Sequence, residues 1–298
     1  MLFPPIAIVG QGCVLPGALS PDELWNLVRS GTSALSRAAD GLWRLAPTAD
    51  RERLAREIPS QVGGYVHGFE RAFDPRGYLV PAESLIGLDP VVLWPLHAAR
   101  QALVSAGIDP LAGNARGAVV LGNLGYPTAS LVDLAIEVWS SEPPRVDRRN
   151  RFMSGLPAHL VAEALGFGAG AFALDAACAS SLYAIKLACD RLHDGLADLV
   201  VAGGVNPADD LFLHAGFAAL RALSPTGQSR PFNRHADGLV PAQGAAVVVL
   251  KRLEDAEAAG DRVLAVIRGV GLTNDGRGRG LLVPVEDGPA RAMAAAYT

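Results

Sequence analysis

The sequence predicts an α/β fold in which helices cover both faces of a mostly parallel sheet. Two patterns in the 298 residues lead to this prediction. Short, unbroken apolar runs such as 117–122 and 245–250 are typical of strands that are buried on both faces. Segments with apolar residues at helical spacing alternate with these runs, and strand–helix alternation favours parallel pairing. The helix that follows Cys178 is rich in small apolar residues, as expected for a helix buried between two layers.

The first helix has clear boundaries in the sequence. Ser20 is a suitable N-cap, Pro21 fits the first turn, and Glu23 completes a capping box. Gly31 provides a stop signal, so we predict a helix over residues 21–30.

The other elements are predicted from the same kinds of signal. The predicted strands are residues 6–10, 117–122, 171–176, 199–202, 245–250 and 263–270. The further predicted helices are residues 90–106 with a kink at Pro95, 128–139, 156–165, 211–220, 254–259, the helix between Cys178 and Gly195, and one that begins near Asp287. Residues 32–80 and 140–150 are rich in proline, glycine or arginine and are predicted to be irregular.

Composition excludes several classes of protein. Half of the residues are hydrophobic and 19% are charged, which indicates an ordered globular protein. The net charge of −4 and the lack of a basic block argue against nucleic acid as a partner. No apolar run reaches 18 residues, so no membrane span is expected. Three cysteines cannot all pair with one another, and we therefore expect a reducing, cytoplasmic location.

The strand over 171–176 meets the next helix at Cys178. Unpaired backbone N–H groups and the macrodipole at a helix N-terminus stabilise a thiolate. The flanking residues Ala177 and Ala179 are small, so a substrate can approach the sulfur. A free cysteine is more often a small buried hydrophobe, but the position at this joint favours the other interpretation. We therefore predict that Cys178 is a nucleophile.

The remaining cysteines and glycines are better explained without catalysis. Cys189 lies on the same helix as Cys178, about 16 Å away at the α-helical rise, and cannot form a disulfide with it. Structural roles are expected for Cys189 and for Cys13, which is predicted to lie in a loop. Gly10 and Gly12 lack the third glycine and the acidic residue of a dinucleotide fingerprint. No cysteine or histidine spacing indicates a metal site.

None of the six histidines is identified by its spacing as a base for Cys178. His193 and His214 are predicted to lie on helix surfaces. His235 is predicted to hold the polar loop 230–238 through hydrogen bonds. The residues alone therefore indicate a nucleophile without a partner base.

Several segments together resemble the β-ketoacyl synthases, the condensing enzymes of fatty-acid and modular polyketide synthesis. Residues 175–182 (DAACASSL) are similar to the active-site signature of that family. Further similar segments follow in the family's order: 6–10 (IAIVG), 16–17 (PG), 22–25 (DELW), 88–90 (LDP), 106–110 (AGIDP), 202–206 (AGGVN), 222–232 (ALSPTGQSRPF), 236–238 (ADG) and 249–253 (VLKRL). The resemblance covers nearly the whole chain and is strongest to type I polyketide and polyunsaturated-type synthases.

The resemblance implies the thiolase-like fold, in which two similar halves, each with a five-stranded mixed sheet, stack as α-β-α-β-α layers. Residues 1–260 would form the first half, and residues 261–298 the start of a truncated second half. The apolar helix after Cys178 would belong to the central layer that both halves share. Family members are homodimers built through the first half, so a homodimer is expected.

The resemblance also implies the chemistry. Cys178 would accept an acyl group from the phosphopantetheine arm of an acyl-carrier protein, and its backbone N–H would be one donor of the oxyanion hole. A malonyl-type extender would then lose carbon dioxide and attack the thioester to give a β-ketoacyl chain. Phe217 would line or gate the acyl pocket. No tightly bound cofactor is expected.

Two features depart from the family. Its two catalytic histidines fall in the second half, beyond Thr298, and none of the six histidines here matches their motifs. The chain alone is therefore expected to acylate poorly and not to condense. Gln243 stands where the family usually has an acidic residue, and a local change in packing is expected there.

Two alternatives stay open at this point. The chain could be a non-catalytic or split-enzyme partner that needs a separate second-half chain, because it would otherwise expose a large apolar face. A thiolase-type enzyme that uses coenzyme A ranks third, because the loop 224–238 resembles the carrier-protein type. The sequence identifies neither the starter and extender units nor the chain length or the product.

Overall fold

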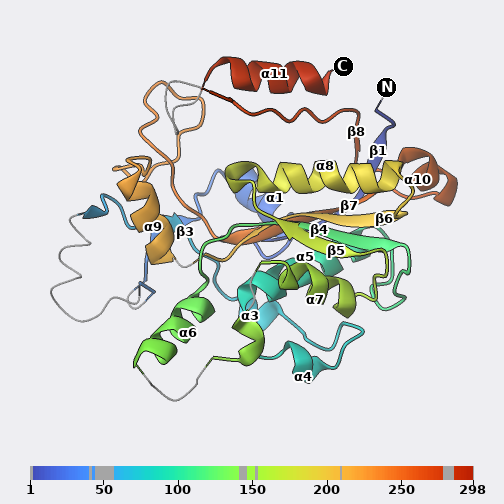
Figure 1. Cartoon of the computed structure of the whole chain (residues 1–298), viewed down its shortest axis with the longest axis horizontal. Helices are drawn as coiled ribbons and strands as arrows, with labels where there is room; N and C mark the ends of the chain where they lie inside the picture. Colours follow the sequence, from blue (N-terminus) through green and yellow to red (C-terminus); the bar gives the residue numbers. More distant parts are fainter. Residues whose placement is uncertain are drawn as a thin grey trace.

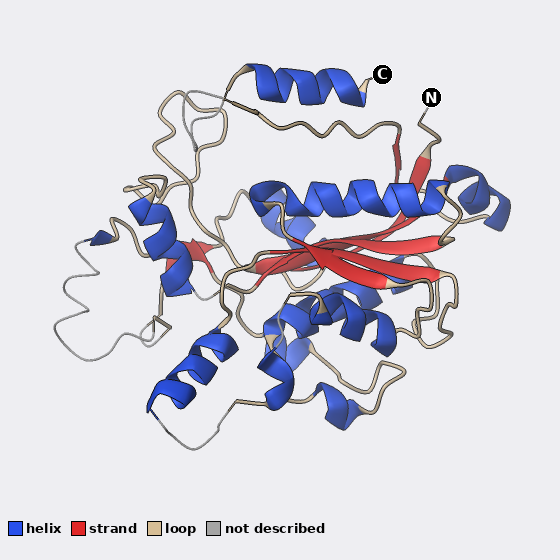
Figure 2. Ribbon diagram, in the orientation of Figure 1, coloured by secondary structure: helices blue, strands red, loops and turns tan. Residues whose placement is uncertain are grey.

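The computed structural model describes residues 3–39, 42–43, 57–140, 146–151, 154–208, 210–277 and 285–297. Its main sheet has six strands: β1 (Ile6–Val14), β4 (Gly117–Asn123), β5 (Ala171–Leu174), β6 (Leu199–Asn206), β7 (Gly244–Arg252) and β8 (Ala265–Ile267). One face of this sheet carries α5 (Pro90–Ser105) and α7 (Leu156–Ala164), and the other carries α8 (Ser180–His193) (Figure 1, Figure 2). The predicted α/β class with both faces covered is confirmed.

The sheet is mixed, with the strand order β5-β4-β6-β7-β1-β8. β4 pairs in parallel with β5 and β6, whereas β7 pairs antiparallel with β6 and β1. The short β8 lies within the predicted strand 263–270. It pairs antiparallel with β1 and so joins the five strands expected for the sheet of the first half. Consequently β5, β4, β6 and β1 run in one direction while β7 and β8 oppose them, so the mostly parallel mixed sheet is confirmed.

β1 continues past the glycine at which we predicted its end. A Cβ at Gly10 would lie 2.0 Å from the carbonyl oxygen of Ala102, and one at Gly12 would lie 1.9 Å from that of Ala98. The two glycines therefore let the backbone of α5 lie directly on the strand, and this contact explains them without a nucleotide. Cys13 is buried within this strand, so its predicted place in a loop was wrong.

An extended segment and a helix near the end of the chain repeat this contact. After β8, a Cβ at Gly269 would lie 2.1 Å from the carbonyl oxygen of Ala296, and one at Gly271 would lie 1.9 Å from that of Ala292. Both alanines belong to α11 (Asp287–Ala296), which runs along the extended segment that follows β8 (Figure 1). The earlier glycine faces the later alanine in both places, so the two strand–helix pairs have the same relative direction.

The remaining elements of the described residues are short or lie at the edges of the layers. They are α1 (Pro21–Ser30), β2 (Leu35–Arg37), β3 (Val62–Gly64), α3 (Phe69–Ala72), α4 (Ala82–Leu85), α6 (Ala129–Ser140), η1 (Arg148–Arg151), η2 (Ala177–Ala179), α9 (Asp210–Ala219) and α10 (Leu253–Ala259). Within the stretch predicted to be irregular, β2 and β3 form an antiparallel pair. Residues 141–145 of the second predicted loop lie outside the described residues.

The predicted boundaries of α1 are confirmed. The Ser20 side chain accepts a hydrogen bond from the Glu23 N–H at 3.3 Å, and Gly31 ends the helix with a φ of 66°. The second predicted helix, α5, continues through Pro95. No helix in the described part of the chain is both long and apolar enough to cross a membrane.

The buried side chains form one cluster on each side of the main sheet. The larger cluster lies between the sheet and the helices α5 and α7. The smaller one lies between the sheet and α8 and includes Ala184, Ala188, Cys189 and Leu192, all fully buried. The helix after Cys178 therefore presents its small residues to the sheet, as its composition predicts.

Candidate active site

Cys178 lies in the single turn η2, between β5 and α8, as the strand–cysteine–helix pattern predicts. Its side chain is exposed, whereas Cys13 and Cys189 are buried. Ala177, immediately before it, has a φ of 50°, in the left-handed region that residues with a Cβ rarely adopt. Backbone outliers of this kind cost free energy and are concentrated at functional turns.

The Asp175 carboxylate ties this turn to a second loop. Its Oδ1 accepts a hydrogen bond from the Ala177 N–H at 2.8 Å. Its Oδ2 accepts one from the Gly125 N–H, also at 2.8 Å, in the loop that follows β4. The Asp175 side chain therefore stabilises the Cys178 turn internally and also links it to the loop after β4.

Ser180 holds the same turn from the helix side. Its Oγ accepts a hydrogen bond from the Ala176 N–H at 2.8 Å and donates one to the Ala177 carbonyl at 2.7 Å. The Ser180 side chain is buried, whereas Ala176 is half-buried and Ala177 is exposed. One hydroxyl group thus restrains the backbone of the two residues that precede Cys178.

The backbone N–H of Cys178 differs from those next to it in its hydrogen bonding. The N–H of Ala179 bonds to the Ala176 carbonyl at 3.2 Å, but within the described part of the chain no acceptor pairs with the N–H of Cys178. An N–H beside an exposed sulfur can donate to the oxyanion that forms when the sulfur attacks a carbonyl. The turn therefore places an exposed sulfur beside a backbone N–H that has no acceptor among the described residues.

Two glycines let the start of α8 approach the sheet. A Cβ at Gly122 would lie 2.6 Å from the carbonyl carbon of Ser180, and one at Gly204 would lie 3.1 Å from the Cβ of Ser181. Gly122 of β4 and Gly204 of β6 are direct partners in the parallel register. The start of α8, next to the Cys178 turn, therefore packs directly on this glycine pair, and a side chain at Gly122 would displace it.

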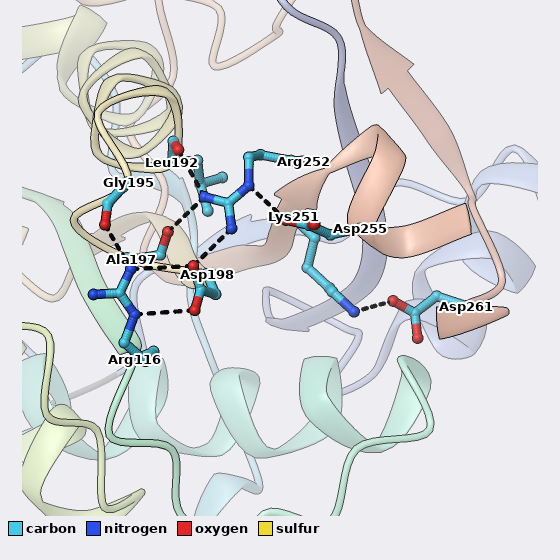
Figure 3. Close-up of polar contacts among 9 residues, drawn as sticks. All are labelled: Arg116, Leu192, Gly195, Ala197, Asp198, Lys251, Arg252, Asp255 and Asp261. Carbon is cyan, nitrogen blue, oxygen red and sulfur yellow. Dashed lines mark hydrogen bonds and ion pairs between the residues drawn. The ribbon is translucent and has the colours of Figure 1, made fainter. Parts of the chain in front are cut away.

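Charged side chains fix the other end of α8. The Asp198 carboxylate accepts hydrogen bonds from Arg116 at 3.0 Å and from Arg252 at 2.6 Å (Figure 3). Arg252 also donates to the carbonyl oxygens of Leu192 at 2.8 Å and Ala197 at 3.1 Å, which closes the C-terminal end of the helix. The hydrogen bonds from the two arginines hold the pKa of Asp198 below its usual range.

β4, β5 and β6 are parallel, so the segments that follow them meet at the carboxyl ends of these strands. The Cys178 turn follows β5, and α9 with Phe217 follows β6, so both lie at this end of the sheet (Figure 1). Phe217 is partly buried in a small apolar cluster with Trp43 and Leu223. The structure thus brings the two predicted site residues to the same end of the molecule.

His193 and His214 are placed away from Cys178 or engaged in packing. His193 is half-buried at the opposite end of α8, and its Nε2 lies 2.9 Å from the Pro4 carbonyl oxygen. His214 is fully buried, with its Nε2 3.2 Å from the Val62 carbonyl oxygen, so its predicted surface position was wrong. The ring of Trp43, which packs 4.9 Å from that of His214, covers this face of α9.

His235 and Gln243 both take part in local hydrogen bonds. The carbonyl oxygen of His235 accepts a bond from Arg230 at 3.2 Å, and its N–H donates to Asn233, which supports its predicted part in holding the loop. The Oε1 of Gln243 accepts a hydrogen bond from the Val66 N–H at 3.0 Å. A glutamine therefore supplies there an acceptor that a carboxylate could equally supply.

The residues that hold the turn were not singled out from the sequence. Asp175 and Ser180 act on backbone atoms, and the signals for this are an Asx turn at Asp175 and a small hydroxyl residue at the start of a helix. Gly122 could have been recognised as a glycine inside an apolar strand, a position that often marks close backbone approach.

The chain was compared with known proteins. The β-ketoacyl synthase N-terminal domain matches residues 4–256. A mycocerosic acid synthase-like polyketide synthase of Mycolicibacterium smegmatis is 36% identical over 291 residues, which are 96% of this chain and 14% of that protein. The pikromycin polyketide synthase component PikAIII of Streptomyces venezuelae is 36% identical over 294 residues, 94% of this chain and 18% of that protein. The chain thus spans less than a fifth of the length of these relatives.

Solved structures agree with this result. The PfaC keto synthase–chain length factor has a TM-score of 0.83 and 33% identity, over 99% of this chain and 34% of that one. The oxazolomycin ketosynthase domain OzmH KS7 of Streptomyces albus has a TM-score of 0.81 and 28% identity, over 98% of this chain and 52% of that one. The thiolase-like fold is therefore confirmed, and the chain belongs to the β-ketoacyl synthase family, whose N-terminal domain it contains.

Proposed function

We propose that this chain contributes the acyl-accepting part of a polyketide-type ketosynthase site, with Cys178 as the nucleophile. The observation that carries the proposal is the Cys178 turn itself. It combines an exposed sulfur, a strained residue directly before it, and a backbone N–H available to an oxyanion. Each of these features favours attack on a thioester carbonyl.

In the first step, the sulfur of Cys178 attacks the carbonyl carbon of an acyl chain carried on the phosphopantetheine of an acyl-carrier protein. The carbon–sulfur bond to pantetheine then breaks, and the pantetheine sulfur leaves as a thiol with the proton that Cys178 has lost. The N–H of Cys178 donates to the oxyanion of the intermediate, which is worth about 3 kcal/mol in comparable sites. The product is an acyl thioester on Cys178.

In the second step, a malonyl-type extender loses carbon dioxide, and the electron pair of the broken carbon–carbon bond attacks the acyl carbonyl. Cys178 leaves as a thiolate, and the extender carries the new β-ketoacyl chain. Groups that assist decarboxylation must lie near the acyl carbonyl, whereas His193 lies at the far end of α8 and His97 and His214 are engaged in packing. None of the six histidines matches the catalytic motifs of the family, so we infer that these 298 residues alone acylate poorly and do not condense.

The division at residue 260 is also part of the proposal. The contact of Gly269 and Gly271 with α11 repeats that of Gly10 and Gly12 with α5. A repeated strand–helix unit supports the assignment of residues 261–298 to the beginning of a second, similar half. The expected homodimer is supported by β5, which forms the edge of the main sheet directly before the Cys178 turn.

Acylation is tested with the full chain and hexanoyl-N-acetylcysteamine, a small thioester that imitates the phosphopantetheine end. We expect one hexanoyl group per chain by intact mass, located by peptide mapping at Cys178. Cys178→Ser should abolish it and Cys189→Ala should not, because Cys189 is buried. A parent chain that stays unmodified, or equal labelling of the Cys178→Ser variant, would show the assignment to be wrong.

A second candidate is a non-catalytic partner that binds a complementary second-half chain. The exposure of Leu182, at 58% on the outer side of α8, favours a covering element there. Failure of Cys178 to react with the thioester, together with retained folding by circular dichroism, would support this candidate over the enzyme.

Light scattering of the purified chain tests the homodimer in the same preparation, since a purely monomeric species would contradict it.

A further inference from the structure

Tyr126 lies in the loop between β4 and α6, next to a residue that contacts the nucleophile turn. The N–H of the preceding Gly125 donates to Asp175 Oδ2 at 2.8 Å, and the Oδ1 of the same carboxylate holds the Ala177 N–H. The position of Tyr126 relative to Cys178 is therefore set by a short chain of hydrogen bonds.

The side chain of Tyr126 reaches α9 from this loop. Its hydroxyl oxygen lies 2.9 Å from the point where a Cβ on Gly216 would be, and two of its ring carbons lie 3.6 Å from that point. Gly216 directly precedes Phe217, which the resemblance places at the acyl pocket. The missing side chain at position 216 is therefore what allows the phenol ring to rest on α9.

The ring thus connects the Cys178 turn with α9, which both lie at the carboxyl ends of the parallel strands. Tyr126 is 38% exposed, so its ring packs against α9 on one side and remains accessible on the other. The loop that carries Tyr126 is bonded to the same carboxylate as the Cys178 turn, and the ring extends from this loop to α9. The ring therefore lies between the Cys178 turn and α9, where it can limit a chain that is attached to Cys178 and extends towards α9.

We propose that Tyr126 is a specificity-determining residue that restricts the length of the acyl chain accepted on Cys178, with Gly216 as the surface on which its ring rests. This inference depends on the proposed acyl transfer to Cys178. Tyr126 and Gly216, about ninety residues apart in the sequence, then act together to limit the acyl chain. The substrate class it implies is short acyl thioesters in preference to long ones.

The test measures the rate constants for acylation of Cys178 in the full chain by propionyl- and decanoyl-N-acetylcysteamine, and compares their ratio between variants. Tyr126→Ala should raise the decanoyl-to-propionyl ratio about tenfold, the discrimination typical of a changed apolar pocket. Tyr126→Phe should leave the ratio within about twofold, because it keeps the ring. A merely structural role would lower both rate constants together and leave their ratio unchanged.

Gly216→Ala tests the surface under the ring. The new Cβ would lie 2.9 Å from the phenol oxygen and would displace the ring from its position on α9, so the ratio should differ from that of the parent chain. The matched controls are Gly155→Ala, whose Cβ meets no atom within 4 Å, and Tyr297→Ala, at a tyrosine that is 92% exposed. Both controls should keep the parent ratio.

The outcomes separate this inference from the proposed function. An unchanged ratio in Tyr126→Ala, with Cys178 still acylated, overturns the role of Tyr126 and leaves acyl transfer intact. A parent chain that is acylated by neither thioester overturns the proposed function itself. Should Tyr126→Ala fail to fold by circular dichroism, Tyr126→Leu replaces it, because leucine retains more of the buried contact and still shortens the side chain.

Discussion

The two ends of α8 are fixed to the fold by different kinds of contact. At the N-terminal end, the absence of a side chain at Gly122 lets the backbone of Ser180 rest on the sheet, and the Ser180 hydroxyl closes the turn. At the C-terminal end, Arg116 and Arg252 share the carboxylate of Asp198 (Figure 3). The end that carries Cys178 is thus held by close packing and by hydrogen bonds to backbone N–H groups, two of them accepted by the Asp175 carboxylate. The opposite end is held by ion pairs between side chains.

This difference matters for how each end responds to its surroundings. Close packing against a backbone is insensitive to salt and pH and allows little adjustment. The carboxylate of Asp198 is 46% exposed, so water and salt weaken its ion pairs. Changes at the two ends should therefore separate into steric effects on the reactivity of Cys178 and electrostatic effects on stability alone.

The largest effect is expected from Gly122→Ala. Its Cβ would lie 2.6 Å from a backbone carbon of Ser180, and the resulting shift should cost about 2 kcal/mol of unfolding free energy. The shift should also slow the alkylation of Cys178 by iodoacetamide. Urea unfolding and the alkylation rate measure the two effects. Gly155→Ala, the same change in open space, should alter neither quantity. A Gly122→Ala variant with the stability and alkylation rate of the parent would show that close packing at Gly122 does not fix this end of α8.

A smaller effect is expected from Ser180→Ala. The variant loses both hydrogen bonds of the Oγ, and about 1 kcal/mol should be lost, because water can reach the partly exposed backbone groups that remain. Chemical denaturation quantifies this loss, with Ser181→Ala as the control at an exposed neighbouring serine. Equal stability of the two alanine variants would mean that the turn is held without the hydroxyl.

The smallest effect is expected from Asp198→Asn, and it should depend on pH. The arginines lower the pKa of Asp198 in the folded state below that of the unfolded chain. The ionised carboxylate therefore stabilises the fold above about pH 4, and this contribution is lost as the pH falls below that value.

Because the site is half exposed, Asp198→Asn should cost at most about 1 kcal/mol near neutral pH. The difference from the parent protein should shrink when urea midpoints are measured at about pH 2. The alkylation rate of Cys178 should be the same in both proteins. A slower rate would show that the charged end of α8 also controls the nucleophile, and would break the comparison.

Elements whose signals are local could be predicted from the sequence. The Ser20 cap and the Gly31 stop define α1 correctly, and the position of Cys178 between strand and helix follows from the change of apolar spacing around it. The end of β1 could not be predicted in this way. Gly10 reads as a stop, whereas it continues the strand because α5, far along the chain, lies against it.

The errors and omissions share one cause, which is contact between distant segments. His214 is buried rather than on a helix surface, because Trp43 packs against it from a distant stretch that has no periodicity. The spacing of apolar residues in α9 does not show which face is covered. The contact between Tyr126 and Gly216 could not be predicted from the sequence either, since neither residue belongs to a motif.

The unequal exposure of the three cysteines has a consequence for handling the protein. Burial raises the pKa of Cys13 to about 11 and that of Cys189 to about 12, so neither presents a thiolate near neutral pH. A folded chain therefore offers reagents a single sulfur, Cys178, while an unfolded chain offers all three. The number of thiols titrated per chain is thus a direct measure of the folded fraction in any preparation, and it can be read before any activity is assayed.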